Sequence, residues 1–183
     1  EVKADLMMRT SQVVEDLIAS QEYDIGLAET PTPRSSIKIE TFDLECVIAL
    51  PEIDPLAQKD VLTPTDLRDY PMAMLFGDHH VTVATQAAFA SCDAALNRRF
   101  VLRTFLPSLQ LVGAGLCGAV VDRITAATSP APGVVFRKFA PAITSSVSLL
   151  LPAHRPTSVL TNAFRIHLRE QLAQIDGIYA SKY

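Results

Sequence analysis

Two long extended stretches constrain the fold of this chain more than any other feature. One covers residues 37–50, where apolar and polar residues alternate and the apolar phase shifts between Ile39 and Phe42. The other covers residues 143–151. Because a strand that changes its apolar face can leave one sheet and enter another, we expect the chain to pass from one lobe to a second and to return.

Shorter strands and helices alternate in the rest of the sequence. The period of two in residues 2–8 predicts a strand, followed by a helix capped by Thr10 or Ser11 and a second strand at residues 23–28. Thr63, with Pro64 after it, predicts a short helix. Further strands are expected at 72–76, 100–104, 116–121 and 134–139, with helices at 82–92, from 107, after 122 and from about 160 to 175. The pattern indicates an α/β fold, with lobe I formed by residues 1–46 and 145–183 and lobe II by residues 47–144.

The composition narrows the class of function. The 183 residues carry a net charge of -4, whereas nucleic-acid binding needs clustered Lys and Arg, so we do not expect this chain to bind DNA by itself. Cys46, Cys92 and Cys117 lie far apart and have no metal-ligand spacing, which favours reduced thiols in a reducing compartment. No apolar run approaches the roughly 20 residues of a membrane span, so we expect a soluble segment.

The glycines at 113, 115 and 118 spell GxGxxG, the fingerprint of dinucleotide binding. That fingerprint needs a strand before it and a helix after it. Here an amphipathic helix comes first and an apolar strand follows, so we expect the glycines to end the helix and turn the chain. No cofactor is predicted. The pair His79 and His80 lacks a third ligand at a suitable spacing, so no metal site is predicted either.

Polar residues follow several of the predicted strands. Arg9, Thr10 and Ser11 follow the first strand, Glu29 and Thr30 the second, residues 77–82 the strand at 72–76, and Asp122 the strand at 116–121. In open α/β sheets such loops lie together at the C-terminal ends of the strands. Here they would bring together a cation, carboxylates and hydroxyls. That set suits a ligand with both carboxylate and ammonium groups.

Several stretches resemble the effector-binding region of LysR-type transcriptional regulators. They are YDIGLAET from residue 23, ALPEIDPLAQK from 49, VGAGLCGAVV from 112 and VSLLLPAHRP from 147. Within the family, the similarity is greatest to the regulator of diaminopimelate decarboxylase and to opine-catabolism regulators. The resemblance implies two Rossmann-like lobes of the type II periplasmic-binding-protein kind, with the first strand and helix of the N-terminal lobe missing and the effector in the cleft between the lobes.

The resemblance also implies a set of effector contacts and partners. By position, the effector loops fall on Arg9, Thr10, Ser11, Glu29, Thr30, His79, His80, Thr82, Phe105 and Asp122. The expected function is ligand sensing in a cytoplasmic transcription factor, not enzymatic catalysis. The expected effector is diaminopimelate, lysine or an opine. The expected partners are further copies of the chain, as a dimer or tetramer, and DNA through an N-terminal winged helix-turn-helix that this sequence does not include.

Two other functions remain open from the sequence. An extracytoplasmic solute-binding protein for amino acids would have the same fold, although three unpaired cysteines fit it poorly. A small α/β enzyme, such as a dehydrogenase, is supported by the glycine pattern alone. Sequence upstream of Glu1 would separate the first two, since a helix-turn-helix favours the regulator and a short apolar signal favours the binding protein.

Overall fold

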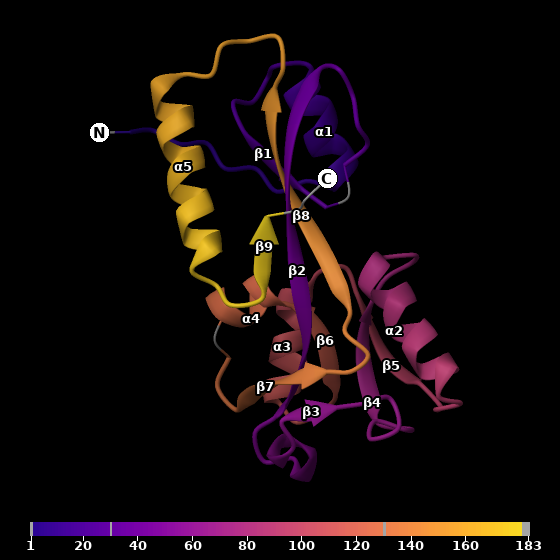
Figure 1. Cartoon of the computed structure of the whole chain (residues 1–183). Coiled ribbons are helices and arrows are strands. Elements are labelled where there is room, and N and C mark those ends of the chain that lie inside the picture. Colours follow the sequence, from indigo (N-terminus) through magenta and orange to yellow (C-terminus); the bar gives the residue numbers. More distant parts are fainter. Residues whose placement is uncertain (1, 30, 130, 181–183) are drawn as a thin grey trace. The chain divides into compact units, whose positions relative to one another are not determined.

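The structure is a computed structural model that describes residues 2–29, 31–129 and 131–180, and it divides into two compact units (Figure 1). Unit 1 contains Glu1–Asp43, Ser146–Gln174 and Tyr179–Tyr183. Unit 2 contains Leu44–Ser145 and Ile175–Ile178. Two long strands, β2 (Ile37–Pro51) and β8 (Thr144–Pro152), contribute residues to both units.

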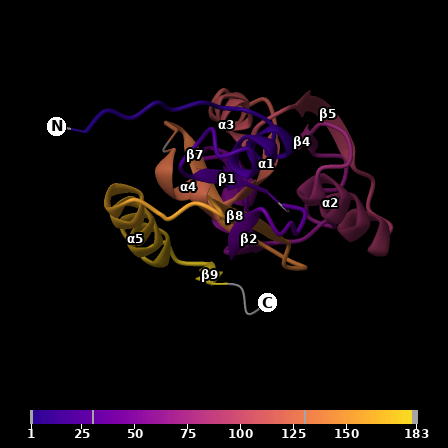
Figure 2. The same cartoon turned by 90° about the horizontal axis from the view of Figure 1, so that it is seen from above.

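Unit 1 is built around a short antiparallel pair of strands. β1 (Gly26–Ala28) pairs with β8, with Leu27 opposite Leu149. Helix α1 (Ser11–Ala19) packs on β1 (Figure 2). The two backbones approach so closely that a Cβ on Gly26 would lie 2.7 Å from Cγ1 of Val14. Ile18, Ala28, Ile37 and Leu150 form the buried core of this unit. Helix α5 (Val159–Ala173) is capped by Ser158, whose hydroxyl accepts the Thr161 amide at 3.0 Å.

Unit 2 carries the larger sheet and the larger core. Its central strand β6 (Gly118–Asp122) pairs antiparallel with β2 and parallel with β4 (Pro71–Leu75), and every residue of β6 is buried. β4 also pairs parallel with β5 (Asn97–Leu102). The other elements are η1 (Pro55–Gln58), β3 (Val61–Leu62), α2 (His80–Ser91), α3 (Phe105–Gly113), α4 (Arg123–Thr128), β7 (Val134–Phe139) and β9 (Ile178–Ala180). Helix α3 places Phe105, Leu109 and Val112 on one face, and all three are buried.

Two predicted elements are wrong. Residues 2–8 form no strand, and Leu6 and Met8 are 93% and 81% exposed. An alternating pattern becomes a strand only where a neighbouring strand pairs with it, and no described strand pairs with these residues. The helix expected from Thr63 is a short hydrogen-bonded turn. Thr63 and Asp66 do cap each other as that prediction required, but Asp69 takes a positive φ of 57° and donates its amide to Ala95, which ends the turn.

Candidate functional site

The polar loops of unit 2 follow strands that run parallel. Because β4 pairs parallel with both β5 and β6, the C-terminal ends of these three strands lie at one edge of the sheet. Each strand is followed there by the start of a helix: α2 after β4, α3 after β5 and α4 after β6. Helix N-termini present unsatisfied N–H groups and favour negative charge, so this edge suits a carboxylate.

His79 and Phe105 meet at this edge. Their ring centroids are 5.6 Å apart with an interplanar angle of 86°. His79 caps α2, because its Nδ1 accepts the Val81 amide at 3.2 Å. His80 points elsewhere: its Nε2 lies 2.9 Å from the carbonyl oxygen of Thr144, to which it can donate. Of the two histidines, the structure therefore brings only His79 into contact with Phe105.

Thr82 and Asp122 are committed to local structure. Thr82 is 1% exposed and donates its hydroxyl to the Leu75 carbonyl at 2.9 Å, which ties α2 to the end of β4. Asp122 is 7% exposed and caps α4: one carboxylate oxygen accepts the Thr125 amide at 2.8 Å and the other accepts its hydroxyl at 2.6 Å. Because a carboxylate can accept more than two hydrogen bonds, this cap leaves Asp122 able to accept a further hydrogen bond from a ligand.

In unit 1 the structure brings Ser11 and Glu29 together. The backbone amide of Glu29 donates to Ser11 Oγ at 3.1 Å, which joins the end of β1 to the start of α1. Thr10 is the N-cap residue of α1 in an extended conformation, without a capping hydrogen bond from its side chain. Arg9 is exposed, and its Nη1 donates to the Met8 carbonyl at 2.9 Å. Thr30 lies outside the described residues.

An ionic cluster beside this loop was not anticipated from the sequence. Glu15 is 3% exposed; its Oε2 accepts the Thr32 amide at 3.1 Å and lies 3.4 Å from a guanidinium nitrogen of Arg34. Arg34 also binds Asp16 at 2.6 Å, and this hydrogen bond lowers the pKa of Asp16. The cluster fastens the loop after β1 to α1. The partners lie 17 to 19 residues apart in the sequence, so a local pattern contains no signal for this cluster.

The glycine pattern is confirmed as the end of a helix. α3 precedes the glycines and β6 follows them, the reverse of the order that a dinucleotide site needs. Gly115 has φ +74°, its amide donates to Val112 at 2.8 Å, and the Leu116 amide donates to Leu111 at 3.1 Å. This is the Schellman arrangement that closes a helix.

The described residues show neither a membrane-length apolar helix nor a group of three or more His, Cys, Asp or Glu that could hold a metal ion. None of the three cysteines forms a disulfide; Cys46 and Cys117 are buried and Cys92 is exposed.

Comparison with known families decides the class of protein. Residues 1–173 match the family described as the LysR substrate binding domain. The chain belongs to this family. A curated relative, the transcriptional activator protein LysR of Escherichia coli (strain K12), is 30% identical over 184 residues, which are 96% of this chain and 57% of the relative. The regulatory protein NocR of Agrobacterium tumefaciens (strain T37) is 29% identical over 163 residues, 88% of this chain and 54% of the relative.

The chain thus spans about half the length of the curated relatives that it matches. Both relatives are named as regulators, in agreement with the expected regulatory function. Among solved structures, the effector binding domain of QuiR in complex with shikimate is similar, with a TM-score of 0.67 and 15% identity, covering 91% of this chain and 80% of that one. This likeness and those to other LysR-family domains confirm the type II periplasmic-binding-protein-like fold.

Proposed function

We propose that this chain is the ligand-sensing part of a LysR-type DNA-binding transcriptional regulator and that its effector is a small, charged, amino-acid-like molecule. Membership of the LysR substrate-binding family supports the sensing role. The chemistry of the predicted site residues supports an amino-acid-like effector. The QuiR domain, which is similar in fold, binds a small carboxylic acid, shikimate.

One observation carries the proposal: the predicted residues supply acceptors for ammonium groups and donors for carboxylates. In unit 2, the starts of α2 and α3 meet at His79 and Phe105 and favour an anion. Asp122 adds a negative charge at the same sheet edge. In unit 1, Glu29 lies beside Ser11 at the start of α1. A molecule with both charges at its ends satisfies these groups better than a sugar, an aromatic acid or a nucleotide does.

Diaminopimelate is our first candidate effector, followed by lysine and opines. The resemblance of the sequence to the regulator of diaminopimelate decarboxylase and to opine-catabolism regulators favours an amino-acid-like ligand. The alternative of an extracytoplasmic solute-binding protein is less consistent with three cysteines that form no disulfide. A cytoplasmic location, self-association into a dimer or tetramer, and DNA binding through a helix-turn-helix domain outside this sequence belong to the same proposal.

Calorimetric titration with diaminopimelate, lysine and an opine tests the effector class. We expect saturable binding of at least one of them, by this chain or by a longer chain that includes its flanking sequence. Glu29→Gln should weaken binding by roughly tenfold or more, because a hydrogen bond to a charged group contributes about 1.5–3 kcal/mol. Glu22→Gln, at an exposed carboxylate of the same unit, is the matched control and should leave the affinity unchanged.

A test of Asp122 requires a substitution that keeps the N-terminal cap of α4. Asp122→Asn removes the charge, yet asparagine still accepts the Thr125 amide and caps α4 as well as aspartate does. We expect this variant to fold normally and to bind the effector more weakly. If none of the three ligands binds, or if Glu29→Gln and Asp122→Asn both leave the affinity unchanged, the proposed effector site is wrong.

A further inference from the structure

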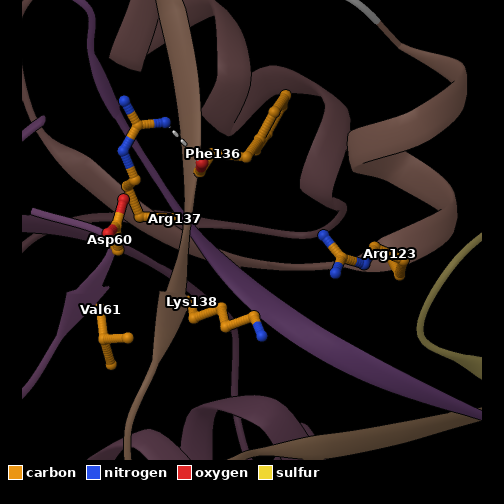
Figure 3. A pocket seen from close by; sticks show the side chains of 6 residues that line it. All are labelled: Asp60, Val61, Arg123, Phe136, Arg137 and Lys138. Carbon is orange, nitrogen blue, oxygen red and sulfur yellow. Dashed lines mark hydrogen bonds between the residues drawn. The ribbon is translucent and has the colours of Figure 1, made fainter.

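A pocket on unit 2 contains more positive charge than the composition of this acidic chain suggests. Its volume is about 480 Å³, and the residues that line it are Asp60, Val61, Arg123, Phe136, Arg137 and Lys138 (Figure 3). Three of these side chains are cationic and one is anionic, whereas the whole chain has a net charge of -4. The pocket is formed by β7, the start of β3 and the first residue of α4.

Arg123 brings a guanidinium with unused donors. Its side chain is 19% exposed, and Nη2 lies 3.7 Å from Oδ2 of Asp176. That separation exceeds an ordinary hydrogen bond, and the Asp176 side chain is 95% exposed, so water screens the pair. Nε of Arg123 is buried and has no hydrogen-bond partner among the described residues. A guanidinium has five N–H groups, and a second anion would find donors available.

Lys138 supplies the second cation. It is exposed on β7, where its backbone pairs with Val47 of β2 and its amide donates to the Asp60 carbonyl at 3.1 Å. Figure 3 shows the Lys138 ammonium and the Arg123 guanidinium on the same side of β7, with their charged ends directed toward one another. Two like charges that line one pocket repel each other unless an anion lies between them.

Arg137 has a different role. Its Nε donates to the Ala57 carbonyl at 2.8 Å and its Nη1 to the Phe136 carbonyl at 2.9 Å. These bonds hold its side chain on the other side of β7 from Lys138 (Figure 3). The charge of Arg137 makes the electrostatic potential in the pocket more positive, but these hydrogen bonds keep its side chain from moving to bind a ligand. Asp60 is the carboxylate that lines this pocket, so the cations outnumber it.

We propose that Arg123 and Lys138 form a binding site for the carboxylate or phosphate group of a small molecule. None of the residues that line this pocket is among the effector contacts proposed above. Binding would neutralise the repulsion between the two cations and would use the donors of Arg123 that Asp176 leaves unsatisfied.

The test is an NMR titration of the chain with inorganic phosphate and, separately, with malonate, each at constant ionic strength. We expect saturable shifts of the amides of Val61, Arg123 and Lys138 with at least one of the two anions. The anion that binds more tightly identifies the group, phosphate or carboxylate, that the site recognises. Shifts that are linear in concentration, or that spread evenly over the surface cations, would refute the proposal.

Three variants sharpen the test. Lys138→Gln should weaken binding by roughly fivefold or more, since it removes one of two charge-assisted contacts at an exposed position that folding does not depend on. Asp176→Asn should strengthen binding about twofold, because it removes the carboxylate that competes for Arg123. Lys38→Gln, at an exposed lysine of unit 1, should change nothing. An unchanged affinity in Lys138→Gln would overturn the assignment, even if Asp176→Asn behaved as expected.

Discussion

Replacing Gly115 by Ala should lower the free energy of unfolding by about 1 kcal/mol. Gly115 has φ +74° and closes α3 through the amides of Gly115 and Leu116. An L-residue in this left-handed conformation costs about 1–2 kcal/mol, and alanine recovers about 0.4–1 kcal/mol because it restricts the unfolded chain. A Cβ at this position would meet nothing within 4 Å, so no steric clash adds to the cost.

Urea unfolding followed by circular dichroism measures this effect. With a slope of about 2 kcal/mol per molar urea, a loss of about 1 kcal/mol moves the midpoint down by about 0.5 M. In a thermal scan the same loss corresponds to a decrease of about 2–4 °C. Gly115→Asn is the matched control and should lose less, because asparagine tolerates the left-handed region better than alanine does.

Three results would contradict this reasoning. If Gly115→Ala is as stable as the parent chain, or if Asn costs as much as Ala, the backbone conformation at Gly115 does not determine the stability of this turn. Saturable NADH binding by the unmodified chain would show that the glycines serve a nucleotide after all. We do not expect NADH binding, because α3 ends at Gly113 before β6 begins at Gly118, the reverse of the order that a dinucleotide site needs.

Two further predictions concern titratable groups. Hydrogen bonds from Lys59 and then Thr63 lower the pKa of Asp66, so its stabilising effect is present above the unfolded pKa of about 3.9 and is lost as the pH falls through the folded value. Asp66→Asn should therefore be less stable than the parent at pH 7, with a gap that narrows below about pH 4 in urea unfolding; a constant gap would contradict the assignment. Burial raises the pKa of the Cys117 thiol to about 11, whereas Cys92 is exposed. A disulfide reagent at about pH 8 should modify Cys92 first and Cys117 only in denaturant, and equal rates in the parent and in Cys92→Ser would refute this.

The site was only partly predictable. The order of residues in the sequence is enough to predict that His79 precedes α2, that Phe105 begins α3 and that Asp122 precedes α4. The parallel pairing of the strands then brings these three positions to one edge of the sheet. The sequence could not show that Thr82 bonds to Leu75 and that Asp122 bonds to Thr125. The same residue types serve as helix caps and as ligand contacts, so the pattern does not separate the two roles. The pocket at Arg123 and Lys138 was missed entirely, since β7 and α4 meet there only through the sheet.

The sequence by itself determined the elements whose hydrogen bonds and caps lie within a few residues. The long alternating run of β2, the apolar strand β6 and the glycine that ends α3 are examples, because side-chain period and backbone freedom are local properties. Only the tertiary structure decided which of the predicted segments pair with other parts of the chain. Residues 2–8 alternate as a strand does but have no described neighbour to pair with, and Thr63 begins a turn that Asp69 ends by bonding to Ala95. Strand pairing and burial depend on residues far away in the chain, and a local pattern contains no information about them.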